Sequence, residues 1–228
     1  MNTTSNIEKI DSHHLEDYRL ISNVIQFEAC IDFLEKCGKV TFGDHFKIRP
    51  VDYKIIFQLL VYFYHDLENA ERLGINFKKG ILLSGPVGCG KTSLMILMRF
   101  FLSRDEQYNM ASTRDIRMEF LRDGFQVIEK YSLKSFLVGQ DMIRPKTYCF
   151  DDLGLEGELR YYGNETNVMA EILLGRYPLF IHQRMKTHAT TNLSSDELEE
   201  VYGNRVRSRM REMFNLIAFE HTVADKRK

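Results

Sequence analysis

The chain has 228 residues, of which 44% are hydrophobic and 28% charged, so it can form one globular domain with an appendage or two small domains. Its formal net charge of −1 excludes the strong overall positive field by which basic proteins hold nucleic acid, so any DNA contact has to be local or shared across an oligomer. The four cysteines are scattered without a CxxC pair, and neither a signal-peptide core nor a membrane-spanning apolar run is present, which predicts a cytoplasmic protein without membrane contact.

The N-terminal part shows helical spacing of apolar side chains over residues 7–37, with more acidic than basic side chains. This predicts a short, acidic helical region, 1–45, that is distinct from the remainder, 46–228. A short helix cannot bury an apolar stripe by itself, so the stripe is expected to pack either on the remainder or on a partner protein. The stripe consists of Leu20, Val24, Phe27, Ile31 and Leu34.

The next segments are a predicted linker and a predicted buried helix. The linker is "CGKVTFGDHFKIRP", residues 37–50, which contains two glycines and ends at a proline. Residues 52–73 are strongly apolar and predict one buried helix that Gly74 stops.

From Phe77 onwards, short apolar strands alternate with helical segments. This alternation predicts an α/β fold with a five-stranded parallel sheet and helices on both faces. The predicted strands span residues 79–84, 108–112, 146–150, 186–191 and 216–219. The predicted helices span residues 91–102, a segment from 114, and residues 125–131, 165–183, 196–201 and 205–213.

The stretch "GPVGCGKT", between the first strand and the first helix, fits the phosphate-loop pattern G-x-x-x-x-G-K-[ST]. Glycines let backbone N–H groups converge on an anion, and the following helix presents its positive dipole end. A chance glycine-rich turn is the alternative, and the apolar strand and helix on either side argue against it. Lys91 is expected to neutralise the β- and γ-phosphates and Thr92 to ligate Mg²⁺. The predicted nucleotide-binding residues are Gly85, Pro86, Val87, Gly88, Cys89, Gly90, Lys91, Thr92 and Ser93.

A phosphate loop requires a carboxylate for the magnesium ion, and "KTYCFDDLG" places two at the end of an apolar strand. Asp151 is expected to hold Mg²⁺, through water, and Asp152 to polarise the attacking water. An Asp-Asp turn after an ordinary strand is the alternative, and the presence of the phosphate loop favours the catalytic interpretation.

Two further groups of polar residues follow. The strand in "KTHATTNLS" ends in Thr190, Thr191 and Asn192, where a polar side chain can lie beside the γ-phosphate and orient the attacking water. The segment "RVRSRMR" then carries Arg205, Arg207, Arg209 and Arg211 on a predicted helix. Such a cluster is either a solvated helix face or a source of an arginine that reaches a neighbouring subunit's ATP.

Taken in order, "GPVGCGKTS", "FDDLG", "THATTNL" and "YGNRVRSRM" resemble the AAA+ ATPases of the DnaC/DnaI helicase-loader and IstB transposition-helper group. The resemblance covers about two-thirds of the chain, from Phe77 onwards. It implies a P-loop NTPase fold with an AAA+ core. By motif position, Asn192 matches sensor 1 and Arg209 matches the arginine finger.

The sequence departs from the family pattern at two places. Asp152 occupies a position where many AAA+ proteins have Glu, and its shorter side chain predicts slow hydrolysis. The chain also ends soon after the last predicted strand, so no C-terminal lid domain is expected and a lid-borne sensor 2 arginine is absent or replaced.

The resemblance implies a DNA-replication accessory protein that binds and hydrolyses ATP with Mg²⁺. Such a protein would self-associate in the ATP state and would load or remodel a replicative helicase, with single-stranded DNA as a possible partner. An IstB-type transposition helper that acts with a transposase is an alternative, as is a nucleotide-dependent switch with negligible turnover. A P-loop kinase is disfavoured, because no acceptor-binding lid is apparent.

Overall fold

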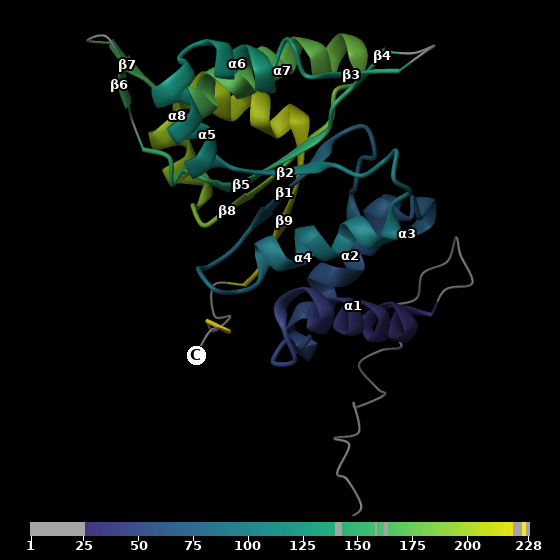
Figure 1. Ribbon diagram of the computed structural model, residues 1–228. Helices are drawn as coiled ribbons and strands as arrows, with labels where there is room; N and C mark the ends of the chain where they lie inside the picture. Colours follow the sequence, from purple (N-terminus) through teal and green to yellow (C-terminus); the bar gives the residue numbers. More distant parts are fainter. Residues whose placement is uncertain (1–25, 140–142, 158, 162–163, 221–224, 227–228) are drawn as a thin grey trace, which may run out of the picture. The chain divides into compact units, whose positions relative to one another are not determined.

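A computed structural model describes residues 26–139, 143–157, 159–161, 164–220 and 225–226 (Figure 1). The contacts divide the chain into two compact units, Met1–Leu73 and Gly74–Lys228. The division expected after residue 45 therefore falls inside the first unit. The physical reason is that the helix before residue 45 packs on a helix that follows it.

That helix, α1 (Phe27–Phe42), packs within the first unit. The ring of Phe27 meets the rings of Tyr53 and Phe57 edge-on, with centroids 5.8 Å apart in both pairs, and both partners lie in α2 (Tyr53–Phe63). Ile31 and Leu34 of the predicted stripe are also buried. The predicted helical segment 7–25, with Leu20 and Val24, lies outside the described residues. The described part of the stripe therefore belongs to a unit that includes α2.

The predicted linker begins later than expected, because α1 continues through Gly38 to Phe42. A Cβ atom at Gly38 would lie 2.1 Å from the ring of Phe46, so the missing side chain makes room for that ring against the helix. Helix α1 ends at Gly43, whose φ of 104° lies in the region that glycine tolerates best. Gly38 thus serves packing rather than a chain break.

The predicted helix over residues 52–73 is two helices. After the short 3₁₀ turn η2 (Pro50–Asp52), α2 ends at Phe63, and α3 (Leu67–Leu73) follows a turn in which His65 has a φ of 54°. The side chain of Asp66 accepts a hydrogen bond from the backbone N–H of Asn69 (3.2 Å), which caps the start of α3. This cap offers the backbone a new helix start inside an apolar run.

The second unit is built on the predicted five-stranded parallel sheet. Its strand order is β2-β5-β8-β1-β9, and each neighbouring pair runs parallel. The pairing of β5 with β8 shifts register between Phe150 and Leu153. The strands are β1 (Gly80–Ser84), β2 (Asn109–Ser112), β5 (Tyr148–Leu153), β8 (Thr187–Thr191) and β9 (Phe214–Ala218).

Helices cover both faces of this sheet, as the alternation predicts (Figure 1). One face packs against four helices, whose buried side chains form one apolar core with Phe150 and Ala189 of the sheet. These are α5 (Thr113–Asp123), α6 (Gln126–Tyr131), α7 (Val168–Gln183) and α8 (Ser195–Met213). The other face carries α4 (Lys91–Met98), followed by the 3₁₀ turn η3 (Arg99–Phe101). No described helix combines the length and the apolar content that a membrane span requires.

Several boundaries differ from those expected. Helix α7 begins at Val168 rather than at 165, because the side chain of Asn167 accepts the N–H of Ala170 (3.0 Å) and caps it there. The two helices predicted over 196–213 are confirmed as the two helical segments of α8, which the non-helical backbone of Gly203 (φ 78°, ψ 161°) separates. Two small antiparallel hairpins were not predicted. They are β3 (Phe136–Val138) with β4 (Ile143–Pro145), and β6 (Leu159–Tyr161) with β7 (Asn164–Thr166).

Candidate nucleotide-binding site

The glycine-rich segment forms the loop between β1 and α4, at the carboxyl edge of the sheet. Gly88 and Gly90 have φ values of 78° and 101°, which side-chain-bearing residues rarely adopt. A Cβ atom at Gly85 would lie 2.7 Å from the Cβ of Phe219. Gly88 and Gly90 are therefore required by their backbone conformation, and Gly85 by the close approach of Phe219. Both requirements are expected of a loop that wraps an anion. Of the other predicted binding residues in the loop, Val87 is exposed and Cys89 is buried.

Lys91 is buried and turns back over its own loop. Its ammonium group donates to the carbonyl oxygens of Gly85 (2.8 Å) and Pro86 (2.9 Å) and to the side-chain oxygen of Asn192. Burial lowers the pKa of Lys91, and the neighbouring Cys89, Asp152 and Asp151 oppose that shift. The structure thus joins the predicted phosphate-binding lysine to the predicted sensor 1 residue, 101 positions further along the chain.

The two residues predicted to hold Mg²⁺ are in direct contact. The hydroxyl of Thr92 donates to both carboxylate oxygens of Asp151, at 2.9 and 3.1 Å. Asp151 also accepts the hydroxyl of Thr190 (2.7 Å). A hydroxyl beside a carboxylate is a donor set that fits a hard divalent cation such as Mg²⁺. Among the described residues, no group of three or more His, Cys, Asp or Glu could enclose a metal ion by itself, so most ligands would have to come from phosphate and water.

Asp152 lies where the register of β5 against β8 shifts, and its φ is 61°. Its backbone N–H donates to Thr190 (2.8 Å), and its carbonyl oxygen accepts the hydroxyl of Thr113 (2.8 Å). Asp enters this left-handed region more readily than most residues. The two adjacent carboxylates are therefore held on a distorted strand end, and Asp152 is placed by its backbone rather than by regular strand geometry.

Hydrogen bonds at the end of β8 connect the neighbouring segments at the carboxyl edge of the sheet. The hydroxyl of Thr191 donates to Leu153 (2.8 Å), and the carbonyl oxygen of Thr191 accepts the N–H of Gly85 (3.2 Å). The threonines that precede Asn192 therefore connect the acidic strand end to the phosphate loop. Sequence reasoning treated this tip as a single polar residue beside the phosphate and did not identify the connecting role of the threonines.

Arg209, the predicted arginine finger, lies against α7. Its guanidinium group donates to the hydroxyl of Tyr177 (3.0 Å), is 4.2 Å from the centroid of that ring, and pairs with Glu212 (3.4 Å). None of its recorded contacts within the described part of the chain is with the phosphate loop. The structure brings Lys91, Thr92, Asp151 and Asn192 together, whereas Arg209 contacts Tyr177 and Glu212.

A segment that the sequence did not single out lies on the phosphate loop. The backbone N–H of Lys226 donates to the carbonyl oxygen of Gly88 (3.1 Å). The carboxylate of Asp225 occupies the space that a side chain at Gly88 would need, with one oxygen 1.9 Å from the ideal Cβ position. A charged segment beyond the last strand has no periodicity that could have revealed this contact.

No protein-family model matches the chain, and no curated protein matches it. Several solved structures resemble it, including the following two. One is a DnaC helicase loader, with 19% identity, a TM-score of 0.52, and coverage of 78% of this chain and 95% of that one. The other is a proposed primosome component from Streptococcus pyogenes serotype M3, with 16% identity, a TM-score of 0.50, and coverage of 77% and 83%.

At these identities the likeness concerns the fold. The chain has an α/β P-loop NTPase fold with a five-stranded parallel sheet, and this fold matches that of the DnaC helicase loader structure. The fold class predicted from the four motifs is therefore confirmed.

Proposed function

We propose that this protein is an ATP-binding and ATP-hydrolysing AAA+ protein that assists DNA replication in the manner of a helicase loader. One observation carries the proposal. Lys91, Thr92 and Asp151 lie at one edge of the sheet beside a glycine loop with two left-handed glycines, and Lys91 also contacts Asn192. This is the set of groups that triphosphate binding needs: backbone donors, a cation, a hydroxyl and a carboxylate.

Each group has a proposed role. The Lys91 ammonium would exchange its loop carbonyls for phosphate oxygens, and Thr92 with Asp151 would hold Mg²⁺, which neutralises phosphate charge when bound. Asp152 would accept hydrogen bonds from the attacking water, and Asn192 would orient that water. Asp152 is shorter than the Glu found in many related ATPases, so turnover is expected to be slow.

The nucleotide site is tested by Lys91→Ala, with Lys78→Ala as the matched control because Lys78 is exposed and lies outside the loop. Lys91→Ala should abolish Mg-ATP and ADP binding in calorimetry, whereas Lys78→Ala should bind as the parent protein does. Asp152→Asn should bind ATP without turning it over. Equal ATP affinity for Lys91→Ala and the parent protein would refute the site.

We further propose that Arg209 completes the site of a neighbouring subunit. The support is its position, since its recorded contacts are with Tyr177 and Glu212 and not with its own phosphate loop. Arg209→Ala should then lower kcat by about a thousandfold while ATP affinity is unchanged. Specific activity should also rise with protein concentration. A concentration-independent rate with a fully active Arg209→Ala protein would show that the monomer is sufficient.

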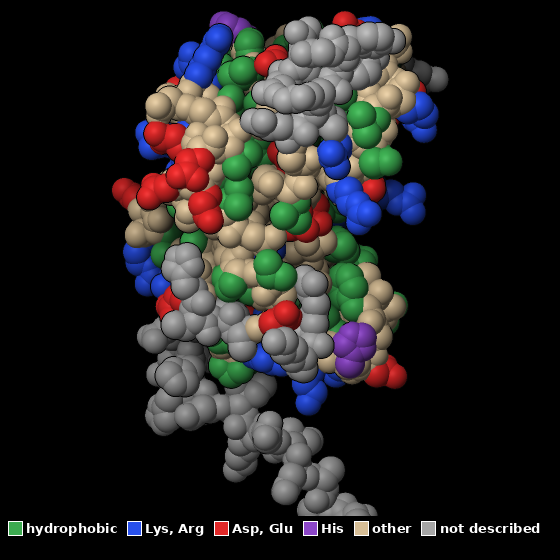
Figure 2. Space-filling view, turned by 90° about the vertical axis from the view of Figure 1, so that its left-hand side faces the viewer, with side chains coloured by type: hydrophobic (Ala, Val, Ile, Leu, Met, Phe, Trp, Pro, Cys, Tyr) green, Lys and Arg blue, Asp and Glu red, His purple; other side chains and the backbone are tan. Residues whose placement is uncertain are grey.

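The proposed partners are a replicative helicase and single-stranded DNA. The face drawn in Figure 2 carries acidic, basic and apolar side chains interspersed, without one continuous basic field, so a DNA site would be local or shared between subunits. The cytoplasm is the proposed location, consistent with free Cys30, Cys37, Cys89 and Cys149. An IstB-type helper that acts with a transposase, and a switch with negligible turnover, are the alternatives. Turnover assays with and without single-stranded DNA, and recovery of a helicase or a transposase, distinguish them.

The N-terminal region, 1–45, is the proposed docking segment for the partner protein. Because Phe27 of α1 packs on α2, the informative deletion removes residues 1–25 and leaves α1 in place. The shortened protein should bind ATP with parental affinity and fail to retain the helicase. Retention of the helicase by the shortened protein would move the docking surface elsewhere.

A further inference from the structure

The first half of the kinked helix α8 is bonded to the segment that follows β5, and its second half is bonded back to the start of the helix. Tyr202 directly precedes the kink at Gly203, and Arg209 lies in the half beyond the kink. The side chain that Tyr202 contacts, Glu156, comes four positions after Asp152. Nothing in the sequence patterns singled out either residue.

Glu156 and Tyr202 form a buried hydrogen-bonded pair, with exposed fractions of 2% and 6%. The Tyr202 hydroxyl donates to one carboxylate oxygen, and the other oxygen accepts the N–H of Gly154 at 2.9 Å. Burial, and then the Glu156 charge, raise the pKa of Tyr202, so its hydroxyl remains a donor. A buried carboxylate whose two oxygens each have a donor fixes both donors in place.

Gly154 connects this pair to the catalytic edge. With a φ of 98°, Gly154 packs so closely on Leu193 that a Cβ atom would lie 2.2 Å from a Leu193 methyl carbon. Leu193 directly follows Asn192, and its N–H donates to Thr191 (3.1 Å). A short chain of contacts therefore leads from the end of β8, through Gly154 and Glu156, to Tyr202.

A second bond acts on the other side of the kink. The guanidinium group of Arg207, which is 8% exposed, donates to the hydroxyl of Ser195 at the start of α8. Ser195 comes three positions after Asn192. The first half of α8 is thus tied by Tyr202 to the segment that follows Asp152. The second half, which carries Arg209, is tied by Arg207 to the start of the same helix.

We propose that Tyr202 is a positioning residue: its hydrogen bond to Glu156 fixes the end of the first half of α8, directly before the kink, and so sets the direction of the second half and the presentation of Arg209 to the neighbouring subunit. The proposal rests on the proposed ATPase function and on the role of Arg209 in trans. In this arrangement Arg209 acts on the ATP of the neighbouring subunit. Its position depends, through α8, on the segment that follows Asp152 in its own subunit.

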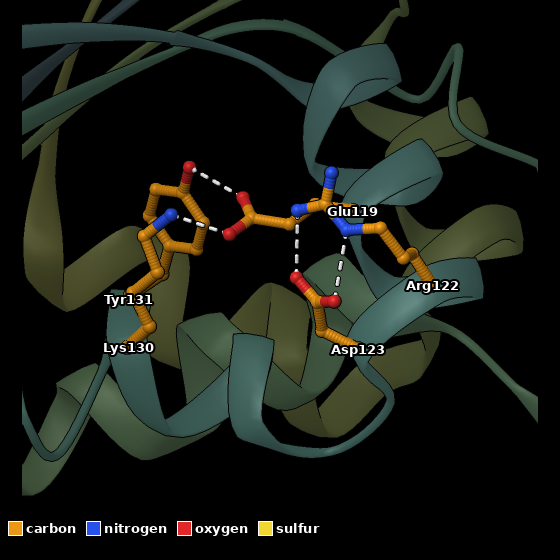
Figure 3. Close-up of polar contacts among 5 residues, drawn as sticks. All are labelled: Glu119, Arg122, Asp123, Lys130 and Tyr131. Carbon is orange, nitrogen blue, oxygen red and sulfur yellow. Dashed lines mark hydrogen bonds and ion pairs between the residues drawn. The ribbon is translucent and has the colours of Figure 1, made fainter.

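Tyr202→Phe removes the hydroxyl and keeps the ring. Its kcat should fall about 10- to 100-fold, since a small misplacement of a catalytic group has effects of this size, while KM and ATP affinity stay at parental values. The matched control is Tyr131→Phe, because Tyr131 also donates to a glutamate, Glu119 in α5 (3.0 Å), away from α8 (Figure 3). The control should lose the same kind of bond without a change in kcat. Glu156→Gln, which loses the carboxylate charge, should resemble Tyr202→Phe.

Mixing subunits separates positioning of the arginine from damage to the variant's own site. Asp152→Asn subunits bind ATP, turn none over and have an intact α8. Added in excess to Tyr202→Phe subunits, they should restore turnover to about the parental rate per active site, because they supply a correctly placed Arg209. Excess Arg209→Ala subunits should not restore it.

The outcomes distinguish this proposal from the proposed function. Unchanged kcat in Tyr202→Phe, a fall that the Tyr131→Phe control shares, or a fall that Asp152→Asn subunits do not restore would each overturn the positioning role. Slow turnover in Arg209→Ala together with full activity in Tyr202→Phe and Glu156→Gln would overturn this proposal alone. Full activity in Arg209→Ala would overturn this proposal and the role of Arg209 in trans, whereas the nucleotide site itself is refuted only by ATP binding in Lys91→Ala.

Discussion

The polar groups at the two ends of the same parallel sheet differ in burial and in hydrogen-bond partners. At the amino end, Arg176 is fully buried, and its guanidinium group makes five hydrogen bonds, three of them to the backbone carbonyl oxygens of Tyr131, Lys146 and Lys186. At the carboxyl end, Thr92, Asp151 and Asn192 are partly exposed and bond mainly to one another and to Lys91. Both ends are polar, but only one is accessible.

The difference shows which polar contacts serve stability and which can be exchanged. The partners of Arg176 are carbonyl and hydroxyl groups next to the strand starts, and they would be left without donors if the arginine were removed. At the carboxyl end, each contact joins groups that phosphate, Mg²⁺ or water could replace. The amino end is therefore expected to determine folding, and the carboxyl end to determine binding.

The largest effect is expected at the amino end. Arg176→Met should lower the free energy of unfolding by about 3 kcal/mol or more, because several buried acceptors lose a charged donor at once. Urea unfolding measures it. Arg122→Met is the control, since Arg122 pairs with Asp123 on the surface and its loss should have no measurable effect (Figure 3). The folded fraction of Arg176→Met should still bind ATP. Parental stability would show that this end of the sheet does not depend on Arg176.

A pH effect of intermediate size is expected from His188. This residue is buried in β8, and its Nδ1 accepts the N–H of Ile81 (3.0 Å), which requires the neutral ring. Burial, with Lys186 and Arg176 nearby, lowers the pKa of His188 to about 3. The unfolded chain takes up a proton near its ordinary pKa, about 6.5, so this contribution to stability is complete above pH 6.5 and is lost as the pH falls towards 3.

Between pH 7.5 and 5, the lost contribution should amount to about 2 kcal/mol. Urea unfolding at the two pH values measures it, and His188→Asn supplies the comparison because it keeps an acceptor but cannot titrate. The stability difference between the two proteins should narrow as the pH falls. A difference that does not change with pH would contradict the assignment of a neutral buried His188.

The smallest effect is expected at the carboxyl end, where Asp225 and Lys226 lie on the phosphate loop. A nucleotide that uses the face of Gly88 has to displace them, and a site that is only partly available binds with reduced apparent affinity. Asp225→Ala should therefore raise ATP affinity about two- to tenfold in calorimetry. Its free energy of unfolding, measured in urea, should equal that of the parent protein. Weaker ATP binding in Asp225→Ala would mean that the segment assists the nucleotide rather than competing with it.

Contiguous features were predictable from the sequence. The loop from Gly85 to Thr92, the alternation of strands and helices, and the acidic strand end at Asp151 each depend on neighbouring residues whose conformational preferences are local. Features that depend on one particular side-chain contact were not predicted, even where the two residues are close in the sequence. Gly38 reads as a chain break but makes room for Phe46, and α2 and α3 read as one helix until the cap at Asp66 is seen.

The amino-acid sequence alone determined the conformation of the glycine-rich loop and the place of Lys91, because a glycine's backbone freedom and the position of a lysine at a helix start do not depend on the rest of the fold. Tertiary structure decided which groups the loop meets. Lys91 reaches Asn192 across 101 positions and Thr92 reaches Asp151 across 59, since the order of strands brings β1, β5 and β8 together. The pairing of Glu156 with Tyr202, the packing of Arg209 against α7 and the contact of Lys226 with Gly88 have the same origin. A contact between distant residues depends on the packing of whole elements, which local patterns do not encode.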